Sequence, residues 1–75
     1  MLEKAKELLN SLNGYIYYPA FEELKDLADK DNRKTFTLTW TLAYDNPGCE
    51  VYTISLAYIG EDGKIELETA VSYSV

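Results

Sequence analysis

Few residues of this 75-residue chain have a type and setting that could do chemistry, and the single cysteine is the first of them. A reactive thiolate needs a neighbouring cation or histidine to stabilise its charge. The chain contains no histidine, and the residue after Cys49 is Glu50, whose negative charge opposes a thiolate. We therefore interpret Cys49 as an exposed, unreactive thiol.

A metal site is the second kind of chemistry that the residue types allow. Asp29-Lys30-Asp31 begins like a calcium-binding loop, but an EF-hand also needs a central glycine and a terminal glutamate, and position 40 is a tryptophan. Zinc needs three or four cysteine, histidine or carboxylate ligands, which one cysteine and scattered carboxylates do not provide. Gly60 and Gly63-Lys64 lack the spacing of a phosphate-binding loop. We expect no metal and no cofactor.

Paired carboxylates could exchange protons in general acid–base catalysis. Glu66 and Glu68 alternate along the last predicted strand, and we expect both on its outer, solvated face. No apolar surrounding would favour their protonated forms there. We interpret them as residues that keep the chain soluble, so the sequence predicts no catalytic residue and no enzyme.

Threonines recur at alternate positions of the predicted strands and could form a flat binding plane for ice or sugar. Threonine is also a common residue of exposed sheet faces, and the twist of a sheet spoils the match to a flat lattice. We therefore interpret the array as the exposed face of the sheet. Its members are Thr35, Thr37, Thr39, Thr41, Thr53 and Ser55.

Three of the seven tyrosines lie in the short connection NGYIYYP, residues 13–19. A residue before proline is held extended, so residues 15–18 are expected to cross the end of the core like a strand. Ile16 and Tyr18 would then lie opposite Tyr15 and Tyr17. We interpret the tyrosines as a cap on the core, and an aromatic recognition patch is the alternative.

The elements that position these residues can be predicted from the spacing of apolar residues. Apolar residues at helical spacing predict helices over residues 2–12 and 19–30, separated by the Asn13-Gly14 stop and begun by Pro19. Asn32 is the expected left-handed residue after the second helix. Strict alternation then predicts three strands, over residues 34–44, 50–60 and 64–75.

The turns predict how the strands pair. Asp62-Gly63 is typical of a two-residue type I′ hairpin, which would pair Tyr58 with Leu67 and Ile54 with Val71. Residues 45–49, DNPGC, predict a longer loop or a bulge, because Pro-Gly suits a type II turn. The predicted fold is α+β, a two-layer ααβββ sandwich with two helices on a three-stranded antiparallel meander. Its predicted core side includes Trp40, Leu42, Tyr44, Ile65, Leu67, Val71, Tyr73 and Val75.

The composition limits the possible partners. Thirteen acidic and seven basic residues give a net charge of −6, which opposes binding to nucleic acid and to anionic membranes. We find no membrane-spanning run and no leader segment, and one cysteine suits a reducing cytoplasm. We expect one domain over residues 1–75, in monomeric form, with pairing of edge strands in a homodimer as the weaker alternative.

The style of the sequence resembles that of de novo designed α+β proteins. The resemblance rests on the strict alternation of TFTLTWTL, the Asp-Gly hairpin and the Gly and Pro at helix ends, and it implies a structural domain with no evolved activity. Cys49, the DNPGC loop and the tyrosine-rich connection depart from that style and keep a natural orphan open. Two alternatives remain: a small acidic, phage-type inhibitor that binds a basic surface, and a pocket for an apolar ligand between helices and sheet.

Overall fold

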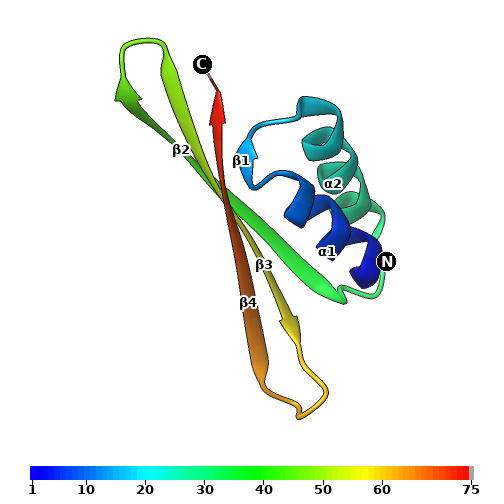
Figure 1. The fold of residues 1–75 in the computed structure, drawn as a ribbon. Helices are drawn as coiled ribbons and strands as arrows, with labels where there is room; N and C mark the ends of the chain where they lie inside the picture. The colour runs from blue at the N-terminus through cyan, green and yellow to red at the C-terminus, as the bar shows by residue number, and fades with distance from the viewer. Residues whose placement is uncertain (75) are drawn as a thin grey trace.

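The computed structural model describes residues 1–74, without the side chain of Asp45, and has two helices on one face of a four-stranded sheet (Figure 1). The predicted α+β class is confirmed. The sheet order is β1-β4-β3-β2, with β1 parallel to β4 and the other neighbours antiparallel. The elements are α1 (Leu2–Ser11), β1 (Gly14–Tyr15), α2 (Tyr18–Lys30), β2 (Phe36–Asn46), β3 (Cys49–Ile59) and β4 (Ile65–Ser74).

The predicted three-stranded ααβββ meander was wrong in one respect, because it omitted β1. Tyr15 pairs with Tyr73, and the backbone N–H of Ile16 donates to the Tyr73 carbonyl oxygen at 2.9 Å. The chain reaches β4 through Gly14, whose φ of +105° favours glycine. The sequence predicted an extended, strand-like segment over residues 15–18, but two paired residues are too few to show strand periodicity, so it did not predict the pairing with β4.

The helices follow their predicted ranges within one residue at each end. The predicted left-handed residue after α2 was wrong: Lys34, with φ of 56°, takes that conformation in place of Asn32. The backbone N–H of Lys34 donates to the Asp31 carbonyl oxygen at 3.1 Å, so the turn into β2 closes at Lys34. Neither helix, within the residues that the structure describes, is long and apolar enough to cross a membrane.

The hairpin between β2 and β3 has the irregularity that the sequence predicts. The strand register shifts between Tyr44 and Asn46, and Asn46 then pairs with Cys49 around Pro47-Gly48. Gly48 has φ of +83°, as the second central residue of a type II turn requires. The bulge keeps Trp40 and Ile54 on the same face, because these two residues pair directly.

The hairpin between β3 and β4 differs from its prediction by one residue of register. Ile59 pairs with Ile65, the Gly60 N–H donates to the Lys64 carbonyl oxygen at 2.7 Å, and Gly63 has φ of +80°. This is a three-residue loop, a type I turn followed by a left-handed glycine, where a two-residue turn was expected. Tyr58 therefore pairs with Glu66 and not with Leu67.

The shift of one residue reverses the two faces of β4. Its even-numbered residues lie on the inner face of the sheet, toward the helices, and its odd-numbered residues lie on the outer face. The expectation that Glu66 and Glu68 lie on the outer face was therefore wrong. The apolar residues of β4 that were predicted for the core lie on the outer face instead: Ile65, Leu67, Val71 and Tyr73. Val75, also predicted for the core, falls outside the described residues.

The core fills only the middle of the inner face. It comprises Ala5, Leu8, Leu9, Leu12, Ala20, Phe21, Leu24, Phe36, Ile54, Leu56 and Ala70. Thirteen helical residues of α2 span about 20 Å, whereas the eleven residues of β3 span about 36 Å. Both hairpins consequently extend past the helices (Figure 1). The prediction that Trp40 is a core residue was wrong, because 45% of its surface is exposed.

Candidate binding surface

Asp31, the one carboxyl group with a clearly shifted pKa among the described residues, organises the turn between α2 and β2. Its Oδ2 accepts hydrogen bonds from Thr35 Oγ1 at 3.0 Å and from the Phe36 backbone N–H at 3.2 Å. Burial opposes the charged form, but these hydrogen bonds outweigh it, and they lower the pKa of the Asp31 carboxyl. The carboxylate of the calcium-like stretch is thus occupied by structural contacts.

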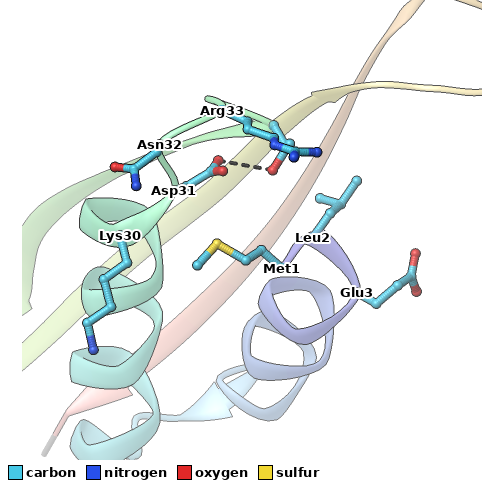
Figure 2. A pocket seen from close by; sticks show the side chains of 8 residues that line it. Met1, Leu2, Glu3, Lys30, Asp31, Asn32 and Arg33 are labelled. Carbon is cyan, nitrogen blue, oxygen red and sulfur yellow. Dashed lines mark hydrogen bonds between the residues drawn. The ribbon is translucent and has the colours of Figure 1, made fainter.

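A cavity of about 600 Å³ lies beside this turn, between the start of α1 and the end of α2. Figure 2 shows the Met1 side chain lying between the two helix ends, while Glu3 points away from it. The space between helices and sheet, where the sequence suggested an apolar-ligand pocket, is filled by fully buried side chains such as Leu24 and Ile54. Among the described residues, no three Cys, Asp or Glu side chains are placed to hold a metal ion.

Of the two strand glutamates on the inner face, Glu68 makes a structural contact. Glu68 Oε2 accepts a hydrogen bond from the Tyr58 hydroxyl at 2.5 Å, and Lys6 Nζ lies 4.3 Å from the centre of the Tyr58 ring. The bond to Glu68 and partial burial raise the pKa of the Tyr58 hydroxyl, so the phenol stays protonated at neutral pH. Glu66, two residues before Glu68 on the same face of β4, is exposed. Cys49 is half-buried at the start of β3.

An aromatic surface lies at the other end of the inner face, where β2 and β3 extend past α2. We define the aromatic surface as Tyr18, Trp40, Leu42 and Tyr44, whose exposed fractions are 44%, 45%, 43% and 72%. Three of these residues alternate along β2, so their side chains share one face. Large apolar side chains in this number, unburied and contiguous, are typical of a binding surface.

Buried and half-buried rings hold the aromatic surface in place. Phe21 makes edge-to-face contacts with Trp40 at 5.5 Å and with Tyr52 at 5.6 Å between ring centres. Tyr18 contacts Tyr52 edge-on at 6.4 Å. Lys25 Nζ lies 4.5 Å from the Phe21 ring centre and 5.5 Å from that of Trp40. Such pairs fix ring orientations, so the rings of Tyr18 and Trp40 are held in preorganised positions.

Hydroxyl contacts fix the tyrosines at the rim of this surface. The Tyr52 hydroxyl donates to Glu50 Oε2 at 3.0 Å, and the Tyr18 hydroxyl donates to Ser74 Oγ at 3.1 Å. Hydrogen bonding with Tyr18 and burial raise the pKa of Tyr52 well above its ordinary value. The Tyr52 phenol is therefore a neutral donor across the physiological pH range.

The aromatic surface borders the free edge of the sheet. β2 is the edge strand, and within residues 1–74 its backbone pairs only with β3. Every second N–H and C=O of β2 therefore points away from the sheet without a strand partner. Backbone hydrogen-bonding groups and apolar side chains are thus available side by side.

The chain matched no protein-family model, no curated protein and no solved structure. The functional conclusion therefore rests on the geometry. Sequence reasoning placed Trp40, Leu42 and Tyr44 in the core because alternation gives the face of a residue but not what covers that face. The lengths of the elements in ångströms carried the missing signal. A strand of eleven residues spans about 36 Å, whereas the longer helix, with thirteen residues, spans about 20 Å.

Proposed function

We propose that this chain is a non-catalytic domain that binds an extended segment of another protein along the edge of β2. The observation that supports it is the exposure of Trp40, Leu42 and Tyr44, at alternate positions of an edge strand. A strand added at this edge would form backbone hydrogen bonds with β2. Its alternate side chains would lie next to the three apolar residues, which would select for apolar residues at those positions.

The non-catalytic part of the proposal is supported by where the titratable groups lie. The groups whose pKa values are shifted lie in three separate parts of the molecule: Asp31, Tyr52, and Tyr58 with Lys6 beside its ring. Asp31, Tyr52 and Tyr58 each form a hydrogen bond with a structural neighbour. The structural-domain hypothesis from the sequence, with its designed style, is consistent with this arrangement. Designed origin, a single domain over residues 1–75 and a reducing, cytoplasmic location stay predictions from the sequence.

The acidic-inhibitor alternative has less support from the geometry. A surface that binds a basic partner needs carboxylates with few cations between them. On the helices, lysines lie among the carboxylates and approach them: Lys25 Nζ is 2.8 Å from Glu22 Oε1, and Lys6 Nζ is 3.7 Å from Glu3 Oε1. The helix layer is therefore of mixed charge, and we favour the edge of β2.

Peptides selected from a random-sequence library displayed on phage, with the whole chain as bait, test this proposal. We expect binders with apolar residues at alternate positions, and the fluorescence of Trp40, the one tryptophan, should report their binding. Trp40→Ala and Tyr44→Ala should each weaken binding roughly tenfold or more, as aromatic anchors do.

The matched control is Tyr15→Ala, which removes an equally exposed tyrosine at the opposite edge of the sheet. It should leave peptide affinity unchanged, and all three variants must keep the circular dichroism of the wild type. Selected peptides that bind Trp40→Ala and Tyr44→Ala as tightly as wild type would exclude the edge of β2 as the site.

A further inference from the structure

The outer face of the sheet has no charged residue over most of its area. We define the outer face as the odd-numbered residues of 37–43, 51–59 and 65–73, which the register places on the side away from the helices. The chain has thirteen acidic and seven basic residues, and none occupies these positions. Exposed sheet faces of monomers are commonly interspersed with charges, which oppose association.

The outer face also presents aliphatic side chains that the fold leaves uncovered. Ile59 pairs directly with Ile65, and Leu67 lies beside them opposite Ala57. The exposed fractions of Ile59, Ile65 and Leu67 are 62%, 75% and 66%. The three form one cluster at the β3–β4 end of the face, and removing such a cluster from water is favourable.

No described segment of the chain covers this face. Both helices lie on the inner face, and β1 extends the sheet sideways beside β4 (Figure 1). The middle of the outer face is polar but neutral, and Ser55 Oγ and Thr69 Oγ1 already bond to each other at 3.0 Å. These hydroxyls can therefore be buried without leaving a charge unpaired.

The distribution of charge indicates what covers the outer face. A charged partner surface would lose hydration there and find no opposite charge in return. A second copy would bring an equally neutral face, because none of the positions that define the outer face carries a charged residue. The face is thus complementary to itself, as a twofold symmetric contact requires.

The area of the face is large enough for such a contact. The eleven residues of β3, at about 3.3 Å each, and three strands about 4.8 Å apart give a flat area of roughly 500 Å² per copy. The accessible area of its side chains is larger than the flat area. Two copies would therefore bury more than about 1,000 Å² in total, which is enough for a specific interface.

We propose that two copies of this chain associate outer face against outer face. The product is a four-layer dimer, helices–sheet–sheet–helices, with the two sheets packed as in a β-sandwich. The aliphatic cluster of Ile59, Ile65 and Leu67 becomes buried, and the threonine rows form the neutral centre of the contact. The edge of β2 stays open in this dimer, so the inference is independent of the peptide-binding proposal.

Sedimentation equilibrium of the full chain, with a reducing agent to exclude Cys49 crosslinks, tests the proposal. We expect a dimer for the wild type. Leu67→Lys should raise the dissociation constant at least about tenfold, because each copy then buries an unpaired charge. Glu66→Lys is the matched control: it places the same side chain one residue away on β4, on the inner face, and should leave the dimer intact.

A second variant keeps the test valid if Leu67→Lys folds poorly. Thr53→Glu lies at an exposed site of the central strand and adds a charge to the middle of the outer face without removing an apolar contact. It should also give monomers. The proposal is overturned if wild type sediments as a monomer up to about 1 mM, where only dissociation constants well above that concentration escape detection. It is equally overturned if the dimer persists in both Leu67→Lys and Thr53→Glu, which would place the interface elsewhere.

Discussion

The two faces of the sheet differ in how much of their apolar surface the rest of the chain covers. On the inner face, the helices cover Ile54 and Leu56 completely and leave the aromatic surface uncovered at one end. On the outer face, nothing in the described chain covers the aliphatic cluster, and the charges that usually accompany an exposed face are missing from its defined positions. Which apolar side chains of the sheet are buried therefore depends on the lengths of the elements and on one residue of register, more than on the hydrophobicity of each residue.

The largest expected difference between two matched variants compares one residue type on the two faces of β3. Ile54 is fully buried on the inner face, whereas Ile59 is exposed on the outer face. Ile54→Ala should lower the free energy of unfolding by about 2–5 kcal/mol, and Ile59→Ala by less than about 1 kcal/mol. Urea unfolding at a concentration low enough for monomers measures both. Equal losses would mean that the outer face belongs to the folding core.

The next effect tests how much of the inner face is core. Trp40 is half-exposed and packs against Phe21 by an edge contact, so Trp40→Ala should lower the free energy of unfolding by about 1–2 kcal/mol. Phe21→Ala, at a buried site, should cost about 3–5 kcal/mol. Chemical denaturation of both variants separates them. A loss for Trp40→Ala as large as that for Phe21→Ala would contradict its assignment to an exposed surface.

The smallest effect concerns pH and the turn that leads into the inner face. Because the pKa of Asp31 is lowered below its ordinary value of 3.8, the carboxylate stabilises the fold above that pH, and this contribution is lost as pH falls through the folded pKa. Asp31→Asn should slightly lower stability at neutral pH. It should also make the decrease in stability at acidic pH less steep. Thermal unfolding between neutral pH and about pH 2 measures both slopes. Parallel slopes for wild type and variant would show that other carboxylates control the acid transition.

Sequence reasoning predicted the elements with strong periodicity and failed where a single residue decides the outcome. Alternation identified β2, β3 and β4, and Pro47-Gly48 indicated the bulged first hairpin. Asp62-Gly63 fits both a two-residue and a three-residue loop, because glycine accepts the left-handed conformation in each. The choice of loop depends on the whole β3–β4 pairing, and it decides on which face of the sheet every side chain of β4 lies.

The candidate surfaces were less predictable than the fold. The threonines within the strands were placed correctly on the outer face, whereas Thr35 lies before β2 and bonds to Asp31. The aliphatic residues of β4 on that face, Ile65, Leu67 and Val71, were wrongly assigned to the core. Trp40 shows the same limit, since it was correctly predicted to lie on the inner face but wrongly predicted to be buried there. What covers a residue depends on the relative lengths and positions of elements, and local spacing carries no information about those.

The short strand β1 also determines when the fold can be completed. It joins the α1–α2 connection to β4, and the nearby bond from the Val71 N–H to Asn13 Oδ1 spans 58 positions of sequence. The β2–β3 and β3–β4 hairpins are local and can form early, whereas this parallel pair closes a long loop. On the ribosome, the helices emerge first and must wait for residues 72 and 73 before their connection can join the sheet.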